Sequence, residues 1–196
     1  TNTAWIGGYA TANNISIYPN HHPDLHAIAF SPTDPSAMLT GSDGGVHQTS
    51  DDLAGAGTNG GLSWASLNNG YQTTQFYSLA IDYARSGNAI VMGGMQDNGT
   101  WFTNSTSATF AWIDLLGGDG AFSAIASSGS SYYASSQNAT IYRLVINESN
   151  GDLLDYAKAT PVGMTAPQFI NPFILDANNS LIMYLADGDV LWRNND

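Results

Sequence analysis

The feature that most constrains the fold is an internal repeat. The stretches "DLHAIAFS" (24–31) and "QFYSLAID" (75–82) superpose without a gap, and "AFSAIAS" (121–127) and "NPFILD" (171–176) have the same rhythm. Each is a short apolar segment of strand length, too short and too rich in β-formers for a helix. A chain with such self-similarity is expected to be built from one structural unit used several times.

Each repeat continues in the same way. A second apolar run ends in a turn, as in "AMLTGSDGG" (37–45) and "LIMYLADGD" (181–189), and a third short strand follows. A fourth element is "LSWASLNNG" (62–70) in the first repeat and "FAWIDLLGG" (110–118) in the second, and "DLLDYAKA" (152–159) fits the same place in the third. Four strands recurring every roughly 40 to 53 residues are typical of a β-propeller blade. The sequence therefore predicts an all-β fold.

The repeat divides the chain into blades. We expect residues 1–20 to hold the end of a preceding blade and a connection, because "AWIGG" (4–8) is similar to "AWIDL" (111–115) and so predicts an outer strand. Three complete blades and a partial one follow, at 21–72, 73–118, 119–165 and 166–196. An outer strand at the start of the chain could complete the partial blade at its end and close a four-bladed ring. We favour instead a segment of a larger propeller.

Composition limits the partners. The chain has four Lys and Arg residues against 16 acids, a net charge of −12, so it repels phosphate backbones and anionic lipid heads. We expect no nucleic-acid binding and no membrane insertion, and the lack of cysteine excludes thiolate sites. Acidity, polar uncharged composition and Asn-x-Ser/Thr sequons favour an extracellular or cell-surface glycoprotein. The sequons are at Asn14, Asn98, Asn104, Asn138, Asn147 and Asn178.

Several motifs occur together in the order of a known family. "HPDLHAIAFSPTDPSAMLTGSDGGVHQTSD", "GLSWASLNNGYQTTQFYSLAID" and "GGMQDNGTW" resemble the sialidase-like, Asp-box (BNR-repeat) propellers, in the branch with sortilin/VPS10-type and glycosyl-hydrolase-like proteins. The resemblance covers roughly residues 20 to 122. The Asp box itself is interrupted: Ser50-Asp51 begins it, and Gly60, Ser63 and Trp64 complete it. The resemblance implies a propeller fold, and glycoside hydrolysis as one activity.

Acidic loops are the candidate site. In a propeller, the loop entering strand one and the turn between strands two and three share a face. That face would carry Asp24, Asp43, Asp97 and Asp187. For any single one of them a plain hairpin turn is the favoured interpretation, because Asp-Gly and Asn-Gly favour φ > 0. A glycosidase needs two carboxylates about 5–10 Å apart. The catalytic candidates are therefore Asp24, paired with Asp43 or Asp97.

Other loop residues on that face are candidates for ligand binding: His22, His26, Gln96, Asn98, Asp119 and Trp101, with Tyr18 and Tyr77 as further exposed aromatics. His22, Asp24 and His26 form a weak candidate metal set, since His-x-x-x-His outside a helix is poor evidence. No cofactor is predicted, although the acidity is compatible with Ca²⁺. A sialidase is disfavoured, because three arginines in different places cannot form the cluster that grips a substrate carboxylate.

Three functions remain open from the sequence. The leading hypothesis is a propeller that binds a glycan, peptide or protein on its acidic face. The rival is a glycoside hydrolase with paired Asp residues, and the third is a structural assembly module. Two unpaired blade flanks would favour docking to a second copy or to the remainder of a propeller.

Overall fold

A computed structural model describes residues 3–10, 18–54, 61–70, 74–83, 90–105, 107, 112–127, 129 and 131–194. All regular structure in this part of the chain is β-strand, in line with the predicted all-β fold. No helix with the length and apolar character needed to cross a membrane occurs in it. The chain divides into two compact units, Thr1–Thr73 (unit 1) and Thr74–Asp196 (unit 2), and each is described by itself.

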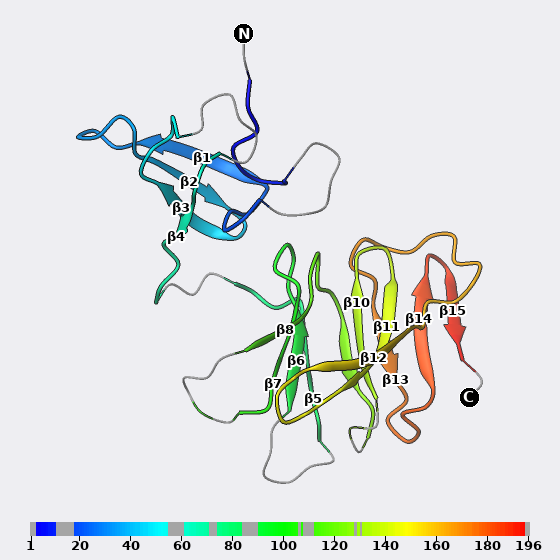
Figure 1. Cartoon of the computed structure of the whole chain (residues 1–196). Helices are drawn as coiled ribbons and strands as arrows, with labels where there is room; N and C mark the ends of the chain where they lie inside the picture. The colour runs from blue at the N-terminus through cyan, green and yellow to red at the C-terminus, as the bar shows by residue number, and fades with distance from the viewer. Residues whose placement is uncertain are drawn as a thin grey trace. The chain divides into compact units, whose positions relative to one another are not determined.

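Unit 1 contains one antiparallel sheet in sequential order (Figure 1). Its strands are β1 (Leu25–Phe30), β2 (Met38–Ser42), β3 (Gly45–Thr49) and β4 (Ala65–Ser66). Met38, Thr40, His47 and Thr49 alternate with less buried neighbours, and these four side chains are at most 6% exposed. The period of two therefore gives this sheet one buried face.

Unit 2 contains three antiparallel sheets (Figure 1). The first consists of β5 (Ser78–Ile81), β6 (Val91–Gly94), β7 (Thr100–Thr103) and β8 (Ile113–Leu116). The second consists of β9 (Ser123–Ile125), β10 (Tyr132–Ser136), β11 (Thr140–Ile146) and β12 (Leu153–Lys158). The third has only β13 (Phe173–Leu175), β14 (Met183–Asp187) and β15 (Val190–Arg193).

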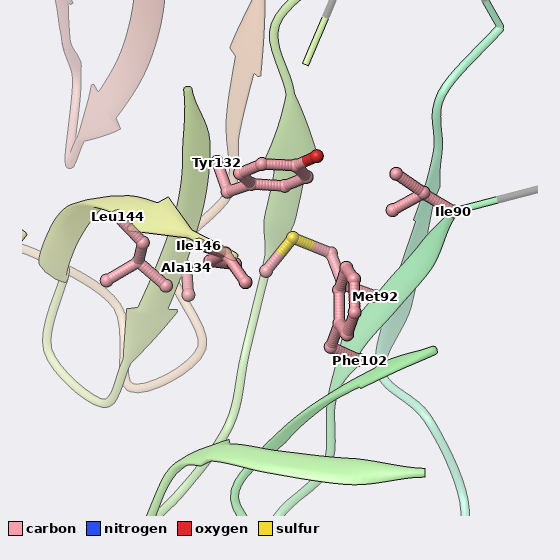
Figure 2. Close-up of a cluster of buried hydrophobic side chains, with 7 residues drawn as sticks. All are labelled: Ile90, Met92, Phe102, Tyr132, Ala134, Leu144 and Ile146. Carbon is pink, nitrogen blue, oxygen red and sulfur yellow. The ribbon is translucent and has the colours of Figure 1, made fainter. Parts of the chain in front are cut away.

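The core of unit 2 lies between successive sheets. Met92 and Phe102 of sheet β5–β8 pack on Tyr132, Ala134 and Leu144 of sheet β9–β12, as Figure 2 shows. A second cluster joins sheet β9–β12, through Ile141, to Phe173, Met183 and Leu185 of sheet β13–β15. Each sheet is thus apolar on the side that meets its neighbour, and the three sheets are held together mainly by burial of apolar side chains.

The first strands of consecutive sheets lie side by side. The Ser78 hydroxyl, on β5, donates to Ala121 O and accepts from Ser123 N on β9, both at 3.2 Å. Gly94 packs so closely against Ala121 that a Cβ on it would overlap the Ala121 backbone. Glycine is therefore required where these two sheets converge.

Unit 1 has its own small core, made of Tyr18, Met38, Leu62 and Trp64. The Tyr18 hydroxyl donates to Leu62 O at 2.9 Å and accepts from Leu62 N at 3.0 Å. Tyr18 is only 2% exposed, so its assignment as an exposed aromatic was wrong. Its phenol is paired with backbone, which is how a buried tyrosine satisfies its polar end.

Residues 4–8, predicted to be the outer strand of a preceding blade, form no ladder with the described strands, and their assignment to such a blade stays a prediction. Instead, side chains hold this segment on the buried face of sheet β1–β4. The Trp64 Nε1–H donates to Ile6 O at 2.7 Å, and Gly8 N–H donates to the His21 ring at 2.7 Å. The segment keeps the packing role expected of an outer strand but lacks a ladder of backbone hydrogen bonds.

Candidate functional site

The polar corner between β6 and β7 in unit 2 is shaped by its backbone. Met95 N–H donates to Gly99 O, and Gly120 N–H donates to Met95 O, each at 2.9 Å. Gly99 N–H in turn donates to Gly118 O at 2.9 Å. A Cβ on Gly120 would overlap Gly99 O, so the loop entering β9 lies directly against this corner. A network of backbone hydrogen bonds and one close backbone approach therefore underlies the shape of this corner.

That corner carries the polar and aromatic residues predicted for it. Asp97 has φ 60° and its N–H donates to Asp119 Oδ1 at 3.0 Å. The Asn98 amide donates to Gln96 O at 3.0 Å. Trp101 Nε1–H donates to Asn98 O at 2.5 Å, and the Tyr77 hydroxyl bonds the Gln96 side chain. Two aromatic rings and several amide and carboxylate oxygens thus gather at one end of unit 2.

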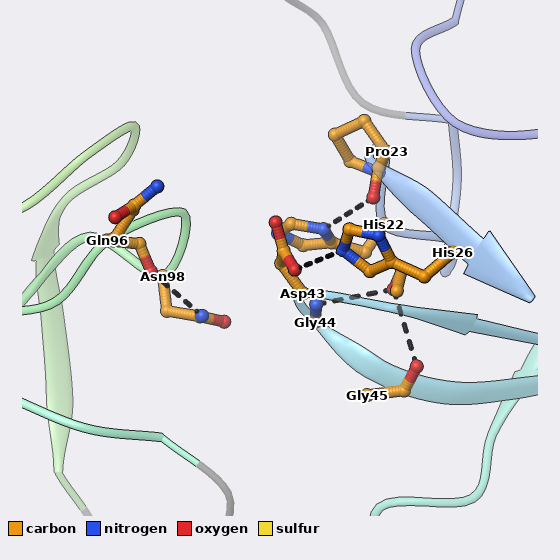
Figure 3. A network of polar contacts seen from close by, with 9 residues as sticks. His22, Pro23, His26, Asp43, Gly44, Gly45, Gln96 and Asn98 are labelled. Carbon is orange, nitrogen blue, oxygen red and sulfur yellow. Dashed lines mark hydrogen bonds and ion pairs between the residues drawn. The ribbon is translucent and has the colours of Figure 1, made fainter.

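In unit 1, the loop entering β1 meets the β2–β3 corner, as predicted (Figure 3). His26 Nε2 bonds Asp43 Oδ1 at 2.5 Å, with 65% and 33% of the two side chains exposed. The His22 ring lies where a Cβ on Gly44 would be, and its Nδ1–H donates to Pro23 O at 2.9 Å. These two imidazole nitrogens are directed at protein atoms rather than presented together with Asp24 to an ion.

Asp24 and Asp43 are close neighbours in the same corner. A carboxylate oxygen of Asp24 lies within 4.8 Å of one of Asp43, and Asp24 has φ 58°. Two carboxylates so near each other match the short spacing of retaining glycosidases, although His26 already bonds one of them. The third catalytic candidate, Asp97, belongs to unit 2 and is described there.

Asp187 does not belong to the candidate site. It is 3% exposed, and it accepts hydrogen bonds from Thr165 N, Ala166 N and Trp192 Nε1. Burial by itself raises the pKa of Asp187, but these hydrogen bonds more than offset it and lower the pKa below its ordinary value. The equivalence with Asp43 was wrong by one residue: Asp187 pairs with Val190 as Ser42 pairs with Gly45, so its side chain points inward.

Sequence reasoning missed two buried histidines in unit 1. His21 is 2% exposed and stacks on Trp64 with ring centroids 4.0 Å apart, and its Nε2 bonds Thr40 Oγ1 at 2.8 Å. His47 is 6% exposed and meets His21 edge-on at 5.4 Å. Burial, followed by the charges of His47 and His22, lowers the pKa of His21 to about 4, and burial likewise lowers that of His47.

One carboxyl outside the predicted set is also perturbed. Asp114 lies on β8 opposite Trp101 of β7, and desolvation raises its pKa above the ordinary value. Nothing in "FAWIDLLGG" distinguishes it, because the shift depends on the neighbouring strand rather than on a motif.

The sequons differ in what their asparagines do. Asn14 lies outside the described residues. Asn104 donates through Nδ2 to Glu148 O at 2.6 Å, and Asn98 donates to Gln96 O, so attachment of a glycan at either would disturb a contact. Asn138, in the β10–β11 turn, and Asn178 are exposed, and Asn147 is half-buried.

Comparison of the chain with protein-family models gives no match, and comparison with curated proteins gives none either.

Proposed function

We propose that the protein is a secreted or cell-surface β-propeller module that binds a glycan at the corner between β6 and β7. The propeller arrangement is supported by unit 2. There the sheets pack face to face in chain order, and the first strands β5 and β9 lie side by side through Ser78. The interrupted Asp box and the family resemblance support the same reading.

The observation that carries glycan binding is the β6–β7 corner. Tyr77 is 46% exposed and its hydroxyl bonds the Gln96 side chain, and the half-buried Trp101 donates to the backbone carbonyl of Asn98. The apolar face of a sugar ring packs on aromatic rings, while its hydroxyl groups donate to amide and carboxylate oxygens. The corner offers both kinds of group on a backbone that needs little ordering when a ligand binds.

The test is a glycan-array screen of the full chain, followed by calorimetry with the best neutral glycan. We expect Gln96→Ala and Tyr77→Phe each to weaken binding roughly fivefold to twentyfold, as the loss of one or two hydrogen bonds implies. Gln137→Ala, at the β10–β11 corner, is the matched control and should bind as the wild type does. Unchanged affinity in the Gln96 and Tyr77 variants, or no glycan bound at all, would refute the proposal.

Glycoside hydrolysis is the second candidate, favoured by the proximity of Asp24 and Asp43. A retaining enzyme would use one of them as nucleophile and the other as acid. Incubation of the bound glycan with the protein, with products followed by mass spectrometry, separates the two functions. Release of a sugar that is lost in Asp24→Asn and Asp43→Asn would establish the enzyme, whereas an intact glycan supports a binding module.

A further inference from the structure

The chain contains four Asn-Gly pairs, a dipeptide with its own covalent chemistry. Their asparagines are Asn59, Asn69, Asn98 and Asn150. The backbone nitrogen of the glycine can attack the side-chain carbonyl carbon of the asparagine, because glycine has no Cβ to hinder the approach. A C–N bond forms, ammonia leaves, and water then opens the cyclic imide to aspartate or isoaspartate. Asn59 lies outside the described residues, and the other three pairs can be compared.

Hydrogen bonds decide how readily a folded Asn-Gly pair reacts. The glycine N–H has to be released before its nitrogen can attack, and the asparagine side chain has to turn its carbonyl carbon toward that nitrogen. If either group is already bonded, the segment must first open locally, and the reaction is slowed by the free energy of that opening.

Asn98 is bonded at both groups. Gly99 N–H donates to Gly118 O at 2.9 Å, as part of the backbone network of the β6–β7 corner. The Asn98 side chain donates through Nδ2 to Gln96 O at 3.0 Å. The nucleophile and the carbonyl carbon of this pair are therefore both held in place.

Asn150, in the connection between β11 and β12, is bonded in the same way. Gly151 N–H donates to Asn147 O at 2.7 Å. The Asn150 side chain donates through Nδ2 to Asp152 Oδ2 at 2.7 Å, and its Oδ1 accepts the Asp152 N–H at 3.2 Å. This pair is therefore also held at both groups.

The segment after β4 is anchored to sheet β1–β4 only as far as Asn68. Leu67 N–H donates to Val46 O at 2.9 Å. The Asn68 side chain accepts the Val46 N–H at 2.9 Å and donates to Gly44 O at 2.7 Å. These contacts lie within unit 1, so they do not depend on the position of unit 2.

The Asn69–Gly70 pair follows directly after this last anchor. Among the described residues, neither the Gly70 N–H nor the Asn69 side chain has a hydrogen-bond partner. Gly70 has a φ of 74°, in the left-handed region that favours glycine. The turn therefore calls for the residue that makes Asn69 reactive, and it leaves both reacting groups unbonded.

We propose that Asn69 is a site of spontaneous deamidation in the folded protein, and that hydrogen bonds protect Asn98 and Asn150 from the same reaction. Conversion to aspartate replaces the amide by a carboxylate. Conversion to isoaspartate also routes the backbone through the former side chain and lengthens it by one methylene group. Either product lies in the segment that leads from unit 1 to unit 2, and neither depends on glycan binding.

Peptide mapping of the full chain tests the proposal. The protein is incubated at mildly alkaline pH and digested with chymotrypsin, which releases residues 68–71 as one peptide. Tandem mass spectrometry then follows, at each asparagine, the mass gain from amide to carboxyl group. We expect conversion at Asn69 to be at least about fivefold faster than at Asn98 or Asn150, because their hydrogen bonds must open first. Equal or slower conversion at Asn69 would overturn the proposal.

The same incubation in concentrated urea tests whether the fold is the cause. Unfolding removes the protecting hydrogen bonds, so the rates at Asn69, Asn98 and Asn150 should become similar. A ranking that is unchanged in urea would overturn the proposal, because the local sequence alone would then explain it.

Gly70→Ala tests the reaction itself. The added Cβ hinders the attacking nitrogen, so conversion at Asn69 should slow at least about tenfold, while Asn98 and Asn150 keep their rates. Gly117→Ala is the matched control and should leave the rate at Asn69 unchanged. Circular dichroism confirms that both variants keep their β-structure. Conversion at Asn69 that is as fast in folded Gly70→Ala as in the wild type would contradict attack by this nitrogen.

Discussion

Acid should destabilise unit 1 through His21. Its Nδ1 accepts the Gly8 N–H at 2.7 Å, so that nitrogen carries no proton and the Nε2–H donates to Thr40 Oγ1 at 2.8 Å. Protonation would place two N–H groups against each other at Gly8 and would bury a charge beside His47. Folding therefore favours the neutral ring.

The size of the effect follows from the two pKa values of His21. The unfolded chain protonates near 6.5 and the folded chain near 4, a difference of about 2.5 units. At about 1.36 kcal/mol per unit, this amounts to about 3 kcal/mol. The contribution of the neutral His21 ring to the free energy of unfolding is fully present above pH 6.5. It is lost progressively as the pH falls toward 4 and changes no further below that value.

Two measurements check this. The four histidines all lie between residues 21 and 47, so imidazole NMR reads unit 1 directly, and one ring should titrate near pH 4 from the Nε2–H tautomer. Urea unfolding from pH 7.5 to 4 should show the loss of stability. His21→Gln should flatten the loss between pH 6.5 and 4 by about 3 kcal/mol relative to the wild type.

Thr40→Val is the matched control. It removes the acceptor of the Nε2–H but keeps the titrating ring, so its stability should be lower at every pH while the slope persists. Carboxylates such as Asp187 are unchanged in all of these variants, so their effect on stability cancels when the free energy of unfolding of a variant is compared with that of the wild type at the same pH. If His21→Gln and the wild type had the same slope, the buried neutral histidine would not be the cause.

Three further predictions concern unit 2. Phe102→Ala should cost about 3–5 kcal/mol in urea unfolding, because the ring is 0% exposed between two sheets; a cost below about 1 kcal/mol would contradict that core. Gly120→Ala should lower the free energy of unfolding by about 1–3 kcal/mol, because the added Cβ overlaps Gly99 O. Gly117→Ala is the control and should be neutral, because open space surrounds that position. Equal effects of the two substitutions would refute the close approach. Asp187→Asn should flatten the stability loss as the pH falls below 3.8, since the lowered pKa stabilises the fold only above that range, and an unchanged acid limb of the unfolding curve would count against it.

The strands could be predicted because the repeat and the period-two alternation are local properties. "DLHAIAFS" and "QFYSLAID" became β1 and β5, and "DLLDYAKA" became β12. What sequence could not supply was register. "ADGD" and "SDGG" look equivalent, yet the ladder places Asp187 opposite Val190 and turns its carboxylate inward. A shift of one residue in strand register turns a side chain to the opposite face of the sheet, and the register is fixed only by pairing with the neighbouring strand.

The candidate site was predicted in part for the same reason. Turn residues identified the corners of Asp43 and Asp97, because glycine and aspartate mark positive φ. The burial of Tyr18 and His21 depends on partners far along the chain, Leu62 and Trp64. No pattern within "IYPNHHPD" distinguishes a tyrosine or histidine that packs inward from one that faces solvent.

The backbone-built corner between β6 and β7 has a consequence for engineering. Its shape depends on amide and carbonyl groups of residues 95, 99, 118 and 120 and on the space left by Gly120. The side chains at 96 and 98 add one hydrogen bond to Gln96 O and one to Tyr77, and the backbone bonds of the frame do not pass through them. A combinatorial library at positions 96 and 98, with the glycines kept, should therefore yield mostly folded proteins that differ in the ligand they bind. The corner could then serve as a surface on which new binding specificities are selected.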